Sequence, residues 1–361
     1  MKHKEKLILC LAAGLLTTNM MAQNAPKLNA NNIDEVVKAM TLEEKASLLI
    51  GATSQAETSG AMVGATKKLV AGAAGTTTAI PRLGIPATVL TDGPAGVRID
   101  PTRKGETKTY YATGFPIGTA LACTWNTPLV EQVGKAIGNE VLEYGCDVIL
   151  GPGMNIHRNP LCGRNFEYYS EDPILCGKIA AAYVRGVQSQ GVGTSIKHFA
   201  VNSQETNRTG VDERVSQRAL REIYLRGFEI AVRESQPWTV MSSYNKINGT
   251  FTQESRDLLT DVLRSDWGFK GMVMTDWTGL RNTAAQIHAG NDLMEPGYTS
   301  QVKDIINKVK SGELSESDMD VCIKRILQYI VRTPHFKGYQ YSDTPDLKAH
   351  AAITRQSATE G

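Results

Sequence analysis

A repeating alternation of two segment types constrains the fold of this chain more than any other feature. Short apolar runs end in polar or charged residues, and segments with helical spacing of apolar residues follow them. The runs lie at 87–90, 115–122, 148–150, 193–196, 239–241, 272–274 and 292–294, and the helical segments include 127–144, 173–190, 216–234 and 255–265. Strands that alternate with helices favour a parallel sheet with right-handed crossover connections.

The number of these units favours a closed barrel over an open sheet. A dinucleotide-binding sheet would need a GxGxxG loop after its first strand, and Gly151-Pro-Gly153 does not fit that spacing. Seven or eight units instead predict a (β/α)8 barrel of the TIM type, with an irregular first strand. Such a barrel takes roughly 250 residues, which a chain of 361 residues accommodates.

Polar residues gather at the carboxyl ends of the predicted strands, where the loops of a barrel converge and its active site lies. Carboxylates there can act as nucleophile or general base. Cationic side chains can bind hydroxyl groups, and aromatic rings offer flat faces on which sugar rings stack. Together they indicate a sugar-binding pocket that contains Asp92, Lys197, His198, Tyr244, Asp276 and Trp277.

Composition excludes several other classes of function. The chain has 39 basic and 37 acidic residues, a net charge of +2, which argues against nucleic acid and against a polybasic membrane-surface protein. It carries no phosphate-binding loop, no HExxH motif and no zinc spacing, so neither a cofactor nor a metal is expected. No stretch is long enough to be a membrane span.

The first 25 residues have the pattern of a secretory signal peptide. Lys2, Lys4 and Lys6 precede an apolar run at 7–16, and small residues follow as far as Ala25. We therefore expect a periplasmic or secreted protein.

Seven stretches of the chain, in order, resemble the N-terminal barrel of glycoside hydrolase family 3, of the β-glucosidase and β-xylosidase type. Among them are Leu90-Thr-Asp-Gly-Pro-Ala-Gly-Val-Arg98 and Gly271-Met-Val-Met-Thr-Asp-Trp277, and the others lie at 115–116, 150–158, 162–173, 197–199 and 241–245. The resemblance implies a barrel domain over residues 26–335. After Lys197-His-Phe199 the chain continues with Ala-Val-Asn, which argues against the β-N-acetylglucosaminidase branch.

The resemblance also implies roles for individual residues. Asp276 matches the nucleophile that forms a covalent glycosyl-enzyme, and Asp92 matches the residue that binds sugar hydroxyls in subsite −1. Trp277 would border the entrance or the +1 side. The other residues implied at the sugar are Arg164, Lys197, His198, Tyr244, Glu205 and Arg208.

Alternatives stay open for several of these residues. Arg164 could serve only to pair with Glu167 or Asp172, and Glu205 with Arg208 could be an ion pair of a surface loop. For Asp276 we expect nearby cations and hydroxyl groups to depress the pKa of the carboxyl, so that it stays ionised.

The general acid/base is the main gap in the resemblance. In β-glucosidase-type members of the family this glutamate lies in a second, α/β-sandwich domain beyond the barrel. Residues 336–361 are predicted to form only a linker or tail toward such a domain, which is absent from this sequence. A second domain or partner chain could supply the acid, or Glu167, Glu205 or Glu295 could replace it.

The predicted activity is that of a retaining β-glycosidase, most simply a β-glucosidase, acting on a β-linked oligosaccharide or glycoside. The alternatives are β-xylosidase specificity, a non-catalytic sugar-binding barrel, and an aldolase that uses Lys197 as a Schiff base.

Overall fold

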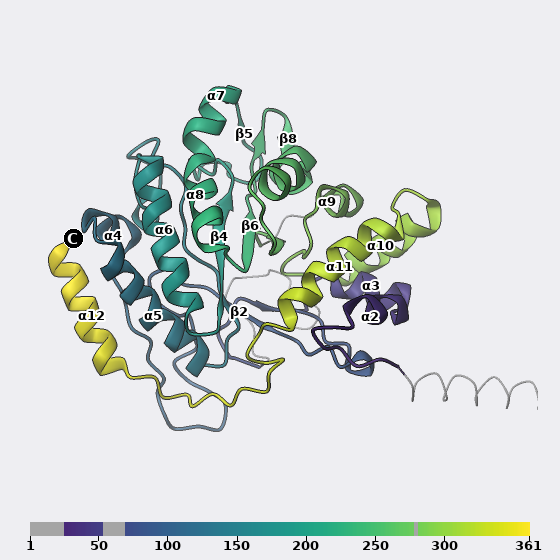
Figure 1. The fold of residues 1–361 in the computed structure, drawn as a ribbon, viewed down its shortest axis with the longest axis horizontal. Coiled ribbons are helices and arrows are strands. Elements are labelled where there is room, and N and C mark those ends of the chain that lie inside the picture. The colour runs from purple at the N-terminus through teal and green to yellow at the C-terminus, as the bar shows by residue number, and fades with distance from the viewer. Residues whose placement is uncertain (1–24, 53–68, 278–280) are drawn as a thin grey trace, which may run out of the picture.

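A central sheet of six strands organises the computed structural model, which describes residues 25–52, 69–277 and 281–361 (Figure 1). The strands lie in the order β1-β2-β3-β4-β6-β9. Their bounds are β1 Gly75–Thr76, β2 Val89–Thr91, β3 Val148–Ile149, β4 Gly193–Phe199, β6 Thr239–Ser242 and β9 Met272–Thr275. Neighbours from β2 to β9 pair in parallel, whereas β1 pairs with β2 in antiparallel fashion. The α/β class predicted from the sequence is therefore confirmed.

Hydrogen bonds continue past both edges of this sheet. Leu293 forms a parallel bridge with Met274 of β9, and Met294 forms one with Ile50. The backbone N–H of Ala52 then donates to the carbonyl of Thr76 in β1, at 2.8 Å. A continuous path of backbone pairing thus runs from β9 back to β1.

One predicted strand is wrong. The run at 115–122 contains no strand, and its second half begins helix α4 (Gly118–Cys123). Pro116 lacks the N–H that a central strand must donate, and the following Ala and Leu residues favour a helix. Gly118 also touches the carbonyl of Glu167 so closely that a Cβ atom would lie 2.3 Å from it, so this helix packs directly onto the turn that contains Phe166.

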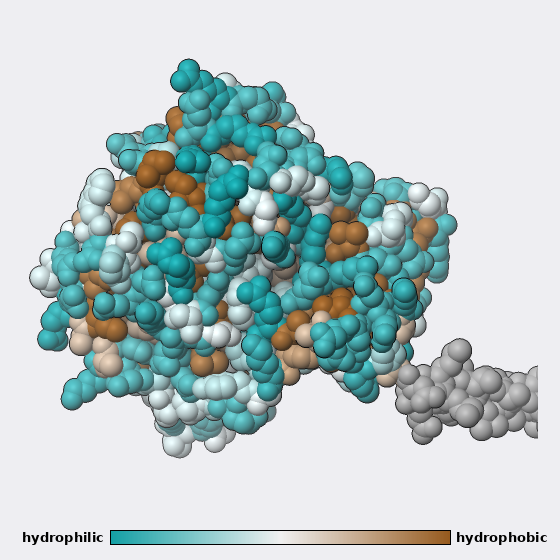
Figure 2. Space-filling model, in the orientation of Figure 1, coloured by the Kyte–Doolittle hydropathy of each residue, from teal (hydrophilic) through white to brown (hydrophobic). Residues whose placement is uncertain are grey.

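Long helices cover one flank of the sheet, as Figure 1 shows. These are α5 (Thr127–Glu143), α6 (Pro173–Gln188) and α8 (Arg226–Ser235). Asn126 and Asp172 cap the first two, each followed by a proline in the first turn. Glycines let α5 and α6 approach closely, since a Cβ on Gly186 would lie 2.2 Å from the carbonyl of Glu131. The outer face over these helices is mostly hydrophilic, with apolar patches between the hydrophilic residues (Figure 2).

The other flank carries a second group of helices (Figure 1). They are α2 Ile33–Ala39, α3 Leu42–Leu48, α9 Thr283–Ala289, α10 Thr299–Ser311 and α11 Glu316–Ile330. The predicted helix at 216–234 is interrupted, because α7 (Gln217–Ala219) leads into α8 through a π-helical turn at Leu220–Tyr224, and a π-helical segment spans Asp257–Asp266. A small sheet of β5 (Asp212–Glu213), β7 (Lys246–Ile247) and β8 (Thr250–Phe251) lies in the loops that follow β4 and β6.

The segment 336–361, predicted as a linker or tail, lies against the rest of the chain and is partly helical. Its helix α12 (Leu347–Glu360) packs on α5 and α4 (Figure 1). The side chain of Asp346 caps the helix by accepting from the N–H of Ala349, at 3.0 Å, and Leu347-Lys-Ala-His-Ala-Ala352 favours a helix. Before α12, Arg103 holds Asp343 through two hydrogen bonds of 2.7 and 2.8 Å.

The predicted signal peptide falls, apart from Ala25, outside the described residues. Within the described ranges, no helix has both the length and the apolar character to cross a bilayer.

Candidate active site

The carboxyl ends of β2, β3, β4, β6 and β9 surround a cavity of about 200 Å³. Lys197 and His198 lie within β4, Asp92 directly follows β2, and Asp276 directly follows β9. Of the nine site residues predicted from the sequence, all except Glu205 line this cavity: Asp92, Arg164, Lys197, His198, Arg208, Tyr244, Asp276 and Trp277. Residues from distant parts of the chain therefore meet where parallel strands end.

Asp276 lies in the wall of the cavity with a carboxylate that is nearly buried, the residue being 8 % exposed. Its own N–H extends the ladder of β9 by donating to the carbonyl of Ser242 at 3.1 Å. One carboxylate oxygen accepts from the N–H of Trp277 at 2.7 Å, and the other lies 3.6 Å from Nε2 of His198. The carboxylate is thus oriented by its surroundings without a cation in direct contact.

The pKa of Asp276 departs from the prediction. Burial raises the pKa of this carboxyl above its usual range, and the opposing influence of Arg164 and Lys197 does not reverse the shift. The expectation of a depressed pKa is therefore wrong.

The reason lies in how the cations of the site are already paired. Lys197 Nζ contacts Asp92 at 3.1 Å, Arg208 contacts Glu205 at 2.9 Å, and Arg164 donates to Glu167. Each cation therefore lies against another carboxylate, and its remaining effect on Asp276 is too weak to offset burial.

Asp92 has the opposite electrostatic balance. Burial would raise the pKa of its carboxyl, but Lys197, the N–H of Gly93 and Arg164 together hold that pKa below its usual range. The two aspartates of the cavity are therefore distinct, since Asp92 is an ionised acceptor locked to a lysine and Asp276 is a carboxylate that burial keeps poorly solvated.

His198 is a neutral donor. Burial, followed by the nearby arginine and lysine charges, lowers the pKa of its imidazole well below its usual range. Nδ1 lies 3.1 Å from the Tyr168 hydroxyl, which accepts from the amide of Asn202 at 3.1 Å, and 3.4 Å from Oδ1 of Asn155. The other ring nitrogen, Nε2, faces the carboxylate of Asp276 at 3.6 Å. Asn155 fixes the backbone of His198 by accepting from its N–H at 2.8 Å.

Tyr168, Asn155 and Asn202 are supporting residues that the sequence reasoning did not single out. The first two lie within the stretches 162–173 and 150–158, which carry the family resemblance. Their contact with His198 spans 30 and 43 positions of sequence, so no local spacing could reveal it.

For Arg164 and Arg208, the structural and the functional interpretation are each supported in part. Arg164 pairs with Glu167 and Arg208 with Glu205, as a purely structural interpretation expects, but both guanidinium groups also line the cavity. The Arg208 guanidinium lies 5.2 Å from the centre of the Tyr244 ring, and the hydroxyl of Tyr244 donates to the carbonyl of Trp277. These pairs hold cationic donors at the cavity wall.

Trp277 forms part of the wall and is 2 % exposed. Its indole N–H donates to the carbonyl of Ala74, at 3.1 Å. The ring is thus fixed beside Asp276 at the level of the cavity.

Comparison with known proteins decides the family. The sequence profile described as the glycosyl hydrolase family 3 N-terminal domain matches residues 27–329. The chain belongs to glycosyl hydrolase family 3.

Two relatives of this family 3 chain are named after different activities. It is 43 % identical over 339 residues to thermostable β-glucosidase B of Acetivibrio thermocellus, covering 92 % of this chain and 42 % of that protein. It is also 43 % identical over 332 residues to an exo-α-(1→6)-L-arabinopyranosidase of Bifidobacterium longum, covering 90 % and 40 %.

Among solved structures, β-glucosidase 3B of Thermotoga neapolitana in complex with glucose matches with a TM-score of 0.87 and 53 % identity, over 91 % of this chain and 47 % of that one. The family 3 chain therefore spans less than half the length of each of these relatives.

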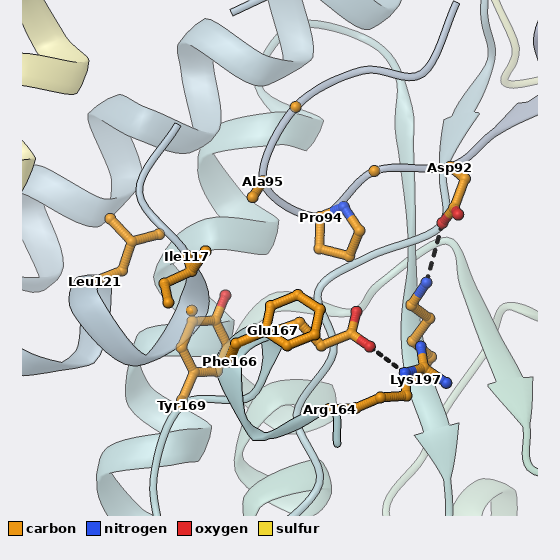
Figure 3. A pocket seen from close by; sticks show the side chains of 13 residues that line it. Asp92, Pro94, Ala95, Ile117, Leu121, Arg164, Phe166, Glu167, Tyr169 and Lys197 are labelled. Carbon is orange, nitrogen blue, oxygen red and sulfur yellow. Dashed lines mark hydrogen bonds and ion pairs between the residues drawn. The ribbon is translucent and has the colours of Figure 1, made fainter. Parts of the chain in front are cut away.

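A second cavity, of about 430 Å³, adjoins the first (Figure 3). The two cavities share Asp92, Arg164 and Lys197, and the second continues over the loop 93–96, over α4 and over the turn 165–167. Across the described parts of the family 3 chain, no three histidine, cysteine, aspartate or glutamate side chains are grouped to hold a metal ion.

Proposed function

We propose that this family 3 chain is the sugar-binding half of a retaining β-glucosidase and that Asp276 is its nucleophile. The observation that carries the proposal is the Asp276 carboxylate itself, which lies in a cavity lined by donors and touches none of the cations there. The relatives named as β-glucosidases support the choice of glycone.

In the proposed reaction, a carboxylate oxygen of Asp276 attacks the anomeric carbon of a β-glucoside. The glycosidic C–O bond breaks, its electron pair goes to the leaving oxygen, and a general acid protonates that oxygen. Water then attacks the anomeric carbon of the glycosyl-enzyme, gives its proton to the conjugate base, and releases the Asp276 carboxylate.

The neighbouring residues have separate tasks in this proposal. Asp92 and Lys197, which line the same cavity as Asp276, bind hydroxyl groups of the sugar. His198 donates from Nε2 without competing for the negative charge, because it is neutral. Hydrogen bonds that tighten as positive charge develops on the ring supply several kcal/mol to the transition state.

The fold belongs to the same proposal as a (β/α)8-type barrel with an irregular start. Eight backbone positions would form its wall: the six strands, the segment 292–294 and the segment 50–52. The bridges through Leu293, Ile50 and Ala52 support this closure.

The general acid/base is proposed to come from a second domain or a partner chain. Asp92 and Asp276 are the carboxylates among the residues that line the smaller cavity, and the lowered pKa of Asp92 makes it a poor proton donor. Glu167 and Glu205 are each held by an arginine. Burial raises the pKa of Glu295 well above its usual range, yet this side chain does not line the cavity.

The remaining parts of the proposal concern location and substrate. The pattern of residues 1–25 supports export to the periplasm or beyond. The substrate would be a β-linked oligosaccharide or glycoside.

One comparison of substrates tests the proposal. The purified chain is assayed with dinitrophenyl β-glucoside, whose leaving group needs no acid, and with methyl β-glucoside, whose leaving group does. We expect turnover of the first and, where no acid is supplied, a rate on the second that is lower by about 10²–10⁴-fold beyond the difference in intrinsic reactivity.

Dinitrophenyl β-xyloside and α-L-arabinopyranoside are assayed in parallel, because relatives with similar identity carry different names. Faster turnover of either would reject glucose as the preferred glycone. Fast hydrolysis of the methyl glucoside by the chain alone would instead show that the acid lies within residues 1–361.

A further inference from the structure

We propose that Asn202 is a positioning residue, which fixes His198 and Arg208 relative to each other in the wall of the smaller cavity. The inference rests on the proposed function, because it takes the cavity beside Asp276 as the place of the reaction. It gives a task to a side chain that lines neither cavity and that the mechanism above does not use.

The amide of Asn202 lies in the loop shortly after the end of β4 and is almost completely buried, the residue being 1 % exposed. Its Nδ2 atom donates to two acceptors, the hydroxyl of Tyr168 and Oε1 of Glu205, each at 3.1 Å. An amide nitrogen carries two hydrogens, so one group can serve both acceptors at the same time. Asn202 therefore joins two parts of the site through a single side chain.

One acceptor leads to the imidazole beside the proposed nucleophile. The Tyr168 hydroxyl lies 3.1 Å from Nδ1 of His198, and Nε2 of the same ring lies 3.6 Å from the carboxylate of Asp276. Tyr168 is completely buried, so loss of the Asn202 amide leaves its hydroxyl with one partner fewer in a place closed to solvent. The contact between Tyr168 and the imidazole therefore depends on Asn202.

The other acceptor leads to a guanidinium group. Oε2 of Glu205 accepts from Arg208 at 2.9 Å, and this guanidinium lines the cavity at 5.2 Å from the centre of the Tyr244 ring. The Arg208 side chain is 41 % exposed, so without a fixed partner it is free to turn toward solvent. Because Asn202 holds one oxygen of Glu205, it also sets the direction of the oxygen that holds Arg208.

This arrangement gives Glu205 a role that differs from the one predicted. The sequence predicts Glu205 at the sugar, but its side chain does not line the cavity. Its two carboxylate oxygens are divided between Asn202 and Arg208. Glu205 therefore acts on a ligand through Arg208, and Asn202 acts through both of them.

The two ends of this path also influence each other electrostatically. Burial is the main cause of the low pKa of His198, and the charges of three nearby cations, Arg208 among them, lower it further. Holding Arg208 in place thus helps to keep the imidazole neutral. Displacing a group of this kind by about 1 Å can cost on the order of 10²-fold in rate.

The test compares Asn202→Ala with Gln286→Ala in the full chain, using dinitrophenyl β-glucoside. Gln286 is the control, because it is a fully buried amide that donates to Gln253 at 3.0 Å and lines neither cavity. We expect kcat/KM per folded molecule to fall by about 10²-fold in Asn202→Ala and by less than about twofold in Gln286→Ala. Equal values of kcat/KM in the two variants would overturn the proposal.

A mutant cycle separates positioning from a general loss of packing. Tyr168→Phe removes the branch to His198, and Glu205→Ala removes the branch to Arg208. In the chain that carries both changes, adding Asn202→Ala should alter kcat/KM by less than about threefold, because the amide then has no side chain to position. A further loss of about tenfold or more in that background would show that Asn202 acts in another way.

The ring nitrogens of His198 give a second readout that needs no turnover. The chain is labelled with isotopic histidine, and the signals of His198 are assigned by their loss in His198→Gln. Nitrogen NMR spectra should show a shifted Nδ1 signal in Asn202→Ala and an unchanged one in Gln286→Ala. An unchanged Nδ1 signal in Asn202→Ala would reject the coupling to His198.

Failure of the proposed function would be seen separately. If the wild-type chain turns over no dinitrophenyl glycoside, the proposed function is rejected, and the NMR comparison decides the role of Asn202. A shifted Nδ1 signal then supports positioning by Asn202, and an unchanged signal rejects it.

Discussion

Two buried aspartates in adjacent parts of the sheet show how differently the same side chain can be held. Asp292 accepts from the N–H of Val273 at 2.8 Å and from Arg264 and Arg325 at 2.6 and 3.0 Å, so two guanidinium groups saturate it. Asp276 accepts from the backbone N–H of Trp277 and interacts with the Tyr244 hydroxyl, has a neutral histidine at 3.6 Å, and borders a cavity.

The difference separates structural charge from reactive charge. A carboxylate whose acceptor positions are filled by fixed cations stabilises the fold and is closed to a ligand. A buried carboxylate without a paired cation lowers the stability of the fold while it is ionised. A positive charge that develops on a sugar ring beside it supplies the missing electrostatic stabilisation. The following variants test this distinction between the two aspartates.

The largest effect is expected from Asp276→Asn. Removing the nucleophile should lower turnover of dinitrophenyl β-glucoside by roughly 10⁴–10⁶-fold, measured by release of dinitrophenol. The fold should survive, because no ion pair is broken. Loss of less than tenfold would show that another group performs the attack.

The same variant should raise the free energy of unfolding at neutral pH. Burial raises the pKa of Asp276 in the folded chain, so the stability of the wild type falls as pH rises from the ordinary carboxyl pKa through the raised one. Asp276→Asn lacks this loss. Urea unfolding at pH 7 should show a more stable variant, and the advantage should vanish in acid, below the ordinary pKa of 3.8.

Asp292→Asn is the matched change at the saturated position. It leaves Arg264 and Arg325 without their buried partner, and we expect a loss of about 3–5 kcal/mol of unfolding free energy. Urea unfolding measures this loss, and intact activity per folded molecule is expected alongside it. A neutral effect on stability would contradict the distinction between the two aspartates.

Asp92→Asn tests a carboxylate with intermediate character, since it is paired with Lys197 yet lines both cavities. We expect kcat/KM on activated glucosides to fall by roughly 10²-fold, because an ionised acceptor for sugar hydroxyls is lost. Lys197 remains in reach of solvent through the cavity, so stability should change far less than in Asp292→Asn. A large loss of stability with unchanged kcat/KM would make the pair structural.

The smallest effect is expected at His335, whose Nδ1 contacts buried Asp147 at 2.8 Å. This hydrogen bond raises the pKa of His335 above 6.5, so its contribution to stability is full below pH 6.5 and is lost as pH rises through the raised pKa. Compared with His335→Gln, the wild type should be more stable at pH 6 by up to about 1 kcal/mol, and the advantage should shrink by pH 9. A gap that widens with pH would contradict this assignment.

The sequence predicted the parts of the fold that repeat and missed the parts that depend on single backbone contacts. The apolar runs before Lys197 and Asp276 became strands, and 127–144 became α5. By contrast, β1 pairs with β2 through only two residues, and Ile50 pairs with Met294 through a single bridge. Neither segment is long enough to show a periodic pattern in the sequence. The prediction of a linker or tail over 336–361 rests on its prolines and polar residues and does not include helix α12.

The site was predictable to the extent that strand ends converge. Parallel strands carry Asp92, Lys197 and Asp276 to one edge whatever their distance in sequence. The direction of the pKa shift of Asp276 was not predictable, because it depends on whether Arg164 and Lys197 contact other carboxylates first. Pairings of this kind are fixed by side-chain packing and leave no signal in the spacing of residues.

Peptide mapping of the trapped intermediate shows whether Asp276 is the nucleophile. The chain is incubated with dinitrophenyl 2-deoxy-2-fluoro-β-glucoside, digested and sequenced by mass spectrometry. We expect one fluoroglucosyl group, on Asp276, and none in Asp276→Asn. An adduct on another carboxylate, or none on a chain whose fold and glucose binding are verified, would contradict it.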